Sequence, residues 1–360
     1  MIELSMLYGS SLSPEGVYFV GDNVITADLY PHRGLTGTQD WVAISIAPKE
    51  DAWMQQMQQQ IGVKPLSAVI LPGTHDTGTY GIPSTPEIAP DLDHTVQDLL
   101  RNDPMQGEHL QYVKGWAVTQ KLDMLTQLKV GIRYFDLRLC KTNENELKTC
   151  HGLYAASIQN IVDDVKQFVN GPNHEKEIIL LDFRSLNIGA EDIDKLSQLL
   201  ISSFGGKIAS PSHFTIHSEV NAFWQQKKQI IILLDNDEYS SRYPELFWSG
   251  SQISGLWANT ENTDELLNKM MSSLQNRDQT KLFNFSLILT PQTQTVVSGL
   301  FGGATNSLIK MTGEYKFRIN DWLEQLQNKA LIRVHGNIIS EDFSNGVDLT
   351  ELAKELNEGK

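Results

Sequence analysis

The chain has 360 residues, and 40% of them are hydrophobic, which is enough for a sizeable core in one large domain or two. It carries 29 Lys and Arg against 44 Asp and Glu, a net charge of −15. A chain this acidic does not attract nucleic acid or an anionic bilayer through its overall charge, so any anion must be bound by a local group of residues. No segment approaches the roughly 18 uncharged apolar residues of a membrane span, and the N-terminus has no basic region followed by an apolar run. We expect a cytoplasmic or membrane-peripheral protein, and the sequence leaves secretion open.

Residues 1–48 contain short alternating stretches such as "GVYFVGDNVITADLY" and "WVAISIAP", separated by Gly, Pro and Asn turns. This pattern predicts strands, but too few for an independent sandwich. We expect a small β-rich segment that packs on the remaining residues, 49–360. The apolar spacing of Glu50 to Ile61 predicts a helix before the first buried strand.

From Pro65 onward, apolar runs alternate with longer helical or irregular stretches. The runs are "LSAVILPG", "IRYFDLRLC", "EIILLDFRSL", "QIIILLDND", "FSLILTP" and "NIISEDF". Runs that are rich in Ile, Leu and Val on both faces are typical of parallel strands covered on both sides. The predicted fold class is therefore α/β.

Charged residues end most of these runs. They are His75-Asp76, Asp136-x-Arg138, Asp182-x-Arg184, Asp235-x-Asp237 and Glu341-Asp342. In a closed parallel barrel the chemistry lies at the carboxyl ends of the strands. The sequence therefore predicts a polar mouth above an apolar barrel, where a ligand binds.

Each of these residues taken alone has an ordinary structural explanation. A single His75 or His151 is more often solvated or capping than catalytic, and Asp136 with Arg138 is equally consistent with an ion pair at the barrel rim. Together, two histidines, an arginine and several carboxylates favour acid–base phosphoryl transfer over metal-assisted hydrolysis, because no three-His or Cys-rich cluster accompanies them. We expect no metal and no cofactor.

Cys140 and Cys150 flank a probable hairpin, so a cross-strand disulfide is geometrically possible. Two cysteines make neither a disulfide framework nor a zinc site by themselves. Because nothing else in the sequence points to secretion, it favours two free thiols in a reducing compartment.

Taken in order, the motifs "LPGTHDTGTY", "GIRYFDLRL", "HGLYAA", "EIILLDFRSL" and "NIISEDF" resemble the X domain of phosphatidylinositol-specific phospholipases C. The likeness is strongest to the small X-domain-containing subgroup and extends from about Trp53 to the C-terminus. It implies a distorted, incompletely closed TIM-type (β/α) barrel that cleaves phosphatidylinositol to diacylglycerol and an inositol phosphate.

The resemblance also implies roles for single residues. His75 is expected to be the general base on the inositol 2-hydroxyl, and His151 the general acid on the diacylglycerol oxygen. Asp342 is expected to orient His75, and Asp76 to hold Arg138 and the substrate hydroxyl.

Neighbouring residues serve these roles in the same interpretation. We expect Glu341 to point to the other side of its strand, and Gly73 to let the backbone turn sharply at the strand end. Calcium-dependent members of the superfamily carry an acidic residue at the position of Arg138, whereas metal-independent bacterial members carry arginine, which "FDLR" matches. The candidates for substrate binding are Asp136, Asp182, Arg184 and Asp235.

The predicted partner is phosphatidylinositol or a related inositol phospholipid at a membrane surface that the protein contacts transiently. We expect four aromatic residues to be buried in the core rather than to form a membrane-facing rim, because core burial is the commoner fate of such side chains. They are Tyr243, Phe247, Trp248 and Trp257. Two other functions stay open: a phosphodiesterase acting on another phospholipid, against which the arginine of "FDLR" argues, and a noncatalytic adaptor that binds inositol lipids.

Overall fold

The computed structural model describes residues 16–20, 23–34, 37–101, 103, 105–300, 307–344 and 347–358. The chain divides into two compact units, residues 1–50 and 51–360. The first contains an antiparallel sheet of order β1-β2-β3, formed by Gly16–Val20, Asn23–Gly34 and Gly37–Pro48. The predicted strands are thus present, while the packing of this segment on the barrel stays a prediction.

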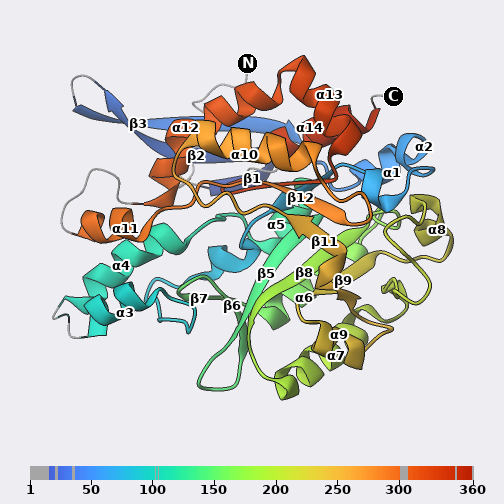
Figure 1. The fold of residues 1–360 in the computed structure, drawn as a ribbon, viewed down its shortest axis with the longest axis horizontal. Coiled ribbons are helices and arrows are strands. Elements are labelled where there is room, and N and C mark those ends of the chain that lie inside the picture. The colour runs from blue at the N-terminus through green and yellow to red at the C-terminus, as the bar shows by residue number, and fades with distance from the viewer. Residues whose placement is uncertain are drawn as a thin grey trace. The chain divides into compact units, whose positions relative to one another are not determined.

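The second unit is built on a curled sheet whose main path holds eight parallel strands (Figure 1). Their order is β10-β9-β8-β5-β4-β13-β12-β11. The strands are β4 (Leu71–Thr74), β5 (Tyr134–Lys141), β8 (Ile179–Asn187), β9 (Ile230–Leu234), β10 (Trp248–Ser249), β11 (Ile253–Gly255), β12 (Leu282–Leu287) and β13 (Ile338–Glu341). A hairpin of β6 (Leu147–Cys150) and β7 (Tyr154–Ser157) extends β5 on one side.

The barrel is open between two strands that follow each other in sequence. β10 and β11 are separated by Gly250–Gln252, yet they stand at opposite ends of the strand order, and no ladder joins them among the described residues. Both strands are short, and the apolar runs of the sequence indicate neither of them as a separate strand. The predicted α/β class and incompletely closed TIM-type barrel are confirmed.

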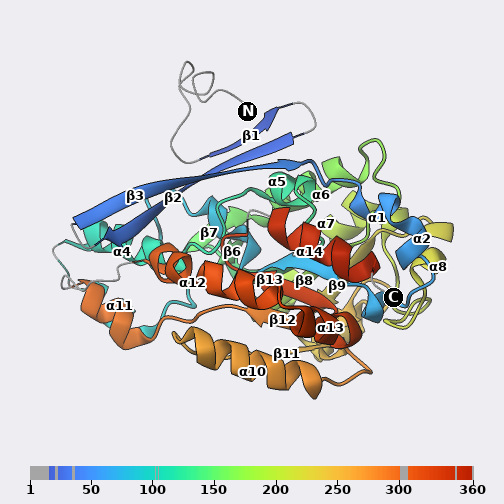
Figure 2. The same cartoon turned by 90° about the horizontal axis from the view of Figure 1, so that it is seen from above.

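Helices alternate with the strands, and in Figure 2 α10 runs along the outer side of β11 and β12. The helices are α1 (Trp53–Gln56), α2 (Gln58–Ile61), α3 (His94–Arg101), α4 (Gln106–Ala117), α5 (Met124–Lys129), α6 (Ile158–Val169), α7 (Ala190–Phe204), α8 (Val220–Gln225), α9 (Asp237–Arg242), α10 (Thr263–Gln275), α11 (Thr293–Leu300), α12 (Leu308–Leu323), α13 (Leu326–His335) and α14 (Val347–Glu358). The predicted helix over Glu50–Ile61 is two short helices that break at Met57. No helix in the described part of the chain is long and apolar enough to cross a membrane.

The interior of the barrel changes from apolar to polar along the strands. Leu180, Leu282 and Ile338 are buried in one apolar cluster at the amino-terminal side. Because alternate residues of a strand share a face, the residues two positions later, namely Asp182, Asn284 and Ser340, face the same interior nearer the carboxyl ends. The pattern that buries the core therefore also places polar groups at the mouth.

Candidate active site

His75 and Asp76 follow β4 at a sharp change of backbone direction. Asp76 adopts a left-handed conformation, with φ 43° and ψ 51°, which Asp tolerates better than most residues. Gly73 lies inside β4, paired with Tyr134 and Ser340, so the expected turn at Gly73 is wrong. The glycine is needed because a Cβ there would lie 2.8 Å from Tyr134 Cδ1.

The imidazole of His75 is held at both nitrogens. Its Nδ1 lies 2.8 Å from Asp342 Oδ1, which comes from the end of β13, 267 residues away. Its Nε2 lies 3.1 Å from Asp76 Oδ2 and 2.8 Å from Arg138 Nη2. These two neighbours suit different protonation states, since Arg138 donates to a neutral ring and Asp76 accepts from a protonated one.

Burial by itself would lower the pKa of His75, but the charges of Asp76 and Asp342 and the hydrogen bond to Asp342 outweigh it and raise the pKa to about 9. The nearby Arg138 opposes this rise. For Asp76, burial would by itself raise the pKa, but Arg138 and the two histidines hold that pKa below its usual value. Asp76 is therefore a buried anion contacted by Arg138 and by both histidines.

Arg138 joins Asp76 to a further carboxylate, that of Asp136. Its Nε lies 2.5 Å from Asp76 Oδ1, and its Nη2 lies 3.7 Å from Asp136 Oδ2. Neither oxygen of Asp76 receives a well-aligned hydrogen bond from the described residues, because these contacts are ion pairs with poorly directed N–H groups. Asp76 therefore keeps acceptor capacity for a hydroxyl group of a ligand.

His151 faces His75 across the site. Its Nδ1 donates to the Ala117 carbonyl at 2.8 Å, which directs Nε2 toward Asp76 Oδ2 at 3.4 Å. The two ring centroids are 6.1 Å apart. The structure thus brings together His75, Asp76, Arg138, His151 and Asp342.

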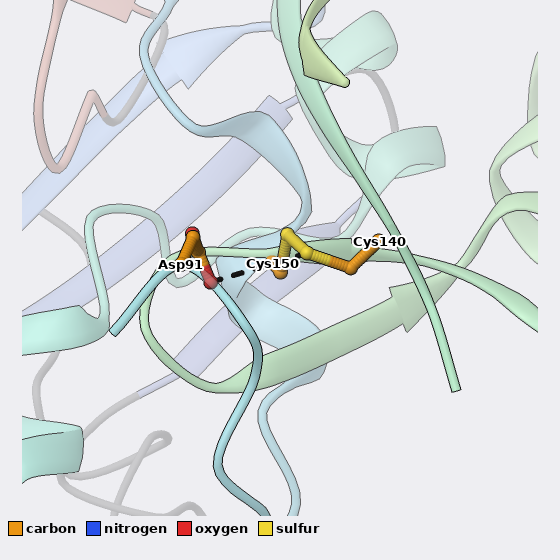
Figure 3. Close-up of side chains that lie close together, drawn as sticks. All are labelled: Asp91, Cys140 and Cys150. Atoms are coloured by element: carbon orange, nitrogen blue, oxygen red, sulfur yellow. Dashed lines mark hydrogen bonds between the residues drawn. A yellow bond between two sulfur atoms is a disulfide. The ribbon is translucent and has the colours of Figure 1, made fainter. Parts of the chain in front are cut away.

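A disulfide lies next to His151 in the sequence. Cys140, two residues after Arg138, is bonded to Cys150, which precedes His151 (Figure 3). The favoured interpretation as free thiols is wrong, because the β5–β6 hairpin brings the two Cα atoms within 5.9 Å. Asp91 Oδ1 lies 3.9 Å from Cys140 Sγ, a van der Waals contact, since a disulfide sulfur carries no hydrogen.

A second polar group lies on the neighbouring strand. Arg184 Nε and Tyr134 Oη both donate to Asp182 Oδ2 at 2.6 Å, and Asp182 is paired in register with Asp136. Burial raises the pKa of Asp182 against the opposing effects of Arg184 and Tyr134. One oxygen of Asp136 and one of Asp182 have no hydrogen-bond partner in the described part of the chain.

The other residues singled out in the sequence differ in their surroundings. Asp235 follows β9 but is exposed, and its side chain makes no hydrogen bond or ion pair with the described residues. Glu341 is separated from Asp342 as expected, since it pairs with Lys316 at 3.6 Å. Of the aromatic group, Phe247 and Trp248 are buried, Tyr243 is half-buried, and Trp257 is 68% exposed.

Sequence reasoning missed residues that position the site. Thr119 and Gln120 are fully buried and bind the backbone at the ends of β4 and β13. A chain of hydrogen bonds of 3.5 and 2.7 Å runs from Tyr134 through Asn284 to Ser340. The tyrosine within an apolar run was the only sequence signal for this interior chain.

Within the described part of the chain, two groups of side chains have a spacing that could hold a cation. One is His75, Asp76 and Asp136, but the Arg138 guanidinium contacts all three, and its fixed charge repels a metal ion. The other is Asp91 with the two cysteines, whose sulfurs are bonded to each other and offer no thiolate. The residues present therefore favour an arginine-based anion site.

Residues 97–235 match the family model described as "Phosphatidylinositol-specific phospholipase C, X domain". The chain is 30% identical to the PI-PLC X domain-containing protein 2 of Mus musculus, over 85% of this chain and 87% of that protein. The chain belongs to the X-domain family of phosphatidylinositol-specific phospholipases C. It is also 22% identical to a variant-surface-glycoprotein phospholipase C of Trypanosoma cruzi, over 81% of this chain and 84% of that protein.

Bacterial phospholipases C are among the solved structures with the same fold. The phosphatidylinositol-specific phospholipase C of Staphylococcus aureus superposes with a TM-score of 0.56 at 14% identity, covering 87% of this chain and 98% of that one. The enzyme from Listeria monocytogenes gives 0.54 at 17% identity, with 87% and 99% coverage. The match supports the open barrel as the fold of this family member.

Proposed function

We propose that the protein is a metal-independent phosphatidylinositol-specific phospholipase C, which cleaves phosphatidylinositol to diacylglycerol and an inositol phosphate. One observation carries the proposal: the Nε2 atoms of His75 and His151 lie within 3.1 and 3.4 Å of the same oxygen of Asp76. Two imidazoles that face one space from two sides suit a reaction that removes one proton and delivers another.

In the first step His75 acts as the general base. Its neutral form accepts the proton of the inositol 2-hydroxyl, and that oxygen attacks the adjacent phosphorus to form a five-membered cyclic phosphate. The nucleophile belongs to the substrate, so its effective concentration is high without any covalent bond to the protein. Asp342 keeps the Nδ1 proton in place and stabilises the imidazolium that forms.

His151 acts as the general acid in the same step. Its Nε2 proton moves to the diacylglycerol oxygen as the phosphorus–oxygen bond breaks, which avoids expulsion of a high-energy alkoxide. The roles then reverse: His151 takes a proton from water, the water oxygen attacks phosphorus, and His75 returns a proton to the 2-hydroxyl. Proton balance is restored after each full cycle.

Arg138 stabilises charge on the phosphoryl oxygens. Its contacts to Asp76, Asp136 and His75 use Nε and Nη2, which leaves Nη1 for a ligand. A guanidinium placed there supplies the positive charge that a metal ion provides in other phosphodiesterases. This assignment predicts activity without calcium.

The same proposal extends to the lipid surface. We place the inositol ring near Asp136, Asp182 and Arg184, where carboxylate oxygens that have no hydrogen-bond partner among the described residues can accept its hydroxyl hydrogens. Trp257 is exposed two residues after β11, on the side of the carboxyl strand ends, and contacts a bilayer transiently without a basic patch.

The deciding experiment measures release of water-soluble inositol phosphate from phosphatidylinositol vesicles in excess chelator. We expect turnover at the rate found with added calcium. Strict calcium dependence would contradict the role of Arg138. Cleavage of phosphatidylcholine or sphingomyelin vesicles instead would indicate a different phosphodiesterase, and vesicle binding without any turnover would indicate an adaptor.

A further inference from the structure

The segment Ala117–Gln120, at the end of α4, contacts the three chain segments that carry His75, His151 and Asp342. Its Ala117 carbonyl accepts from His151 Nδ1 at 2.8 Å. Its Thr119 carbonyl accepts from the Phe343 N–H at 2.7 Å, next to Asp342. We infer that Thr119 and Gln120 are positioning residues that set the spacing of His75, Asp76 and Asp342. The inference rests on the proposed function and adds residues to it.

Gln120 links the backbone of His75 to the backbone just before Asp342, its hydrogen-bond partner. Its Nε2 donates to the His75 carbonyl at 3.0 Å and to the Glu341 carbonyl at 2.9 Å, which uses both hydrogens of the amide. One carbonyl belongs to the proposed base, and the other belongs to the residue just before its carboxylate partner. The side chain therefore fixes the distance between the ends of β4 and β13.

Thr119 holds the same turn from a second direction. Thr79 Oγ1 accepts from the backbone N–H groups of Thr119 and Gln120, both at 3.0 Å, so its own hydrogen is directed to Thr119 Oγ1 at 2.8 Å. The Thr119 hydroxyl hydrogen is then shared by the carbonyls of His75 at 3.0 Å and Asp76 at 3.1 Å. These contacts support the left-handed backbone of Asp76.

The arrangement carries a cost that packing alone does not explain. Gln120 is fully buried, and its Oε1 has no hydrogen-bond partner among the described residues. A methionine fills a similar volume without a buried orphan oxygen. A residue needed only for packing would not require the amide, whereas a bridge between two carbonyls does.

A matched pair of substitutions tests the inference. Gln229 is also buried, and its Nε2 also donates to two backbone carbonyls, those of His174 and Glu177, but it precedes β9 at the opposite end of the barrel. We expect Gln120→Met to lower kcat on phosphatidylinositol about 100-fold with little change in KM, because small misplacements of reacting groups have effects of that size. Gln229→Met is expected to change kcat by less than about threefold.

Two further readouts separate positioning from general destabilisation. The pKa of His75, followed by NMR of its ring, is expected to fall in Gln120→Met and to stay unchanged in Gln229→Met, since only the first loosens the contact with Asp342. Thr119→Val is expected to lose turnover and Thr119→Ser to recover most of it, because serine keeps the hydroxyl.

Equal losses of kcat in Gln120→Met and Gln229→Met would overturn the inference, as would an unchanged His75 pKa in Gln120→Met. If Gln120→Met does not fold, the threonine pair decides: equal activities of Thr119→Val and Thr119→Ser would also overturn it. If the wild-type protein does not cleave phosphatidylinositol, the proposed function fails, while the NMR comparison still tests the positioning of His75.

Discussion

Replacing His75 should change how the stability of the protein depends on pH. Its two carboxylate neighbours lie 2.8 and 3.1 Å from the ring nitrogens and raise its pKa to about 9, from the ordinary value of 6.5. A pKa that is higher in the folded state means that the protonated imidazole stabilises the fold. That stabilisation is fully present below about pH 6.5 and is lost as the pH rises through about 9.

The size of the effect follows from the shift. A difference of one in pKa corresponds to about 1.4 kcal/mol, so the rise in the His75 pKa from 6.5 to about 9 corresponds to about 3 kcal/mol. The ring is only 14% exposed, so solvent screening removes little of this energy. The free energy of unfolding of the wild type, minus that of His75→Gln, should therefore fall by about 3 kcal/mol between pH 6 and pH 10.

Urea unfolding followed by circular dichroism measures this difference at several pH values. Groups that do not contact His75 titrate alike in both proteins and cancel in the subtraction. Parallel pH profiles of the two proteins would refute the reasoning, because they would mean that the imidazole titrates alike in the folded and unfolded states. A difference that grows with pH would mean that burial outweighs the carboxylates.

Further predictions concern the reaction and the disulfide. His151→Ala should lose about 10²–10⁴-fold in kcat on phosphatidylinositol. On an inositol p-nitrophenyl phosphate, whose leaving group needs little protonation, the same variant should stay within about tenfold of wild type. His75→Ala should be impaired on both substrates, and recovery of activity on the second substrate by His75→Ala alone would mean that acid and base are reversed. Arg138→Lys should turn over both substrates poorly, since one ammonium does not contact Asp76, His75 and a phosphoryl oxygen together as the Nε, Nη2 and Nη1 atoms of the guanidinium do, and near-normal rates would exclude this role. The double variant Cys140→Ser, Cys150→Ser should lose about 3 kcal/mol of unfolding free energy in urea titrations, and an unchanged midpoint would mean that the hairpin needs no crosslink.

The strands and the polar residues at their ends could be predicted from the sequence because that information is local. Hydrophobic runs are encoded residue by residue, and a charged residue directly after such a run must emerge where the strand leaves the core. This holds for His75, which follows β4, whereas Asp136 and Arg138 lie within β5, where alternate residues share one face. The family resemblance then supplied Asp342 as a partner, which composition and spacing could not have identified.

The tertiary structure decided which strands pair and how closely side chains approach one another. One example is the open seam between β10 and β11, two very short strands that stand at opposite ends of the strand order. The state of Cys140 and Cys150 depends on how closely the hairpin brings them together. No local sequence pattern predicts the seam or the disulfide, since each depends on where both partners lie in the folded chain.

Thr119 and Gln120 illustrate the same limit within the site. In the sequence they are two polar residues after a helix, with nothing to distinguish them from a solvated loop. Only the folded chain shows them fully buried, with Gln120 joining carbonyls that are separated by more than half of the sequence. A hydrogen bond requires its donor and acceptor within about 3 Å, and that condition is set by the fold as a whole.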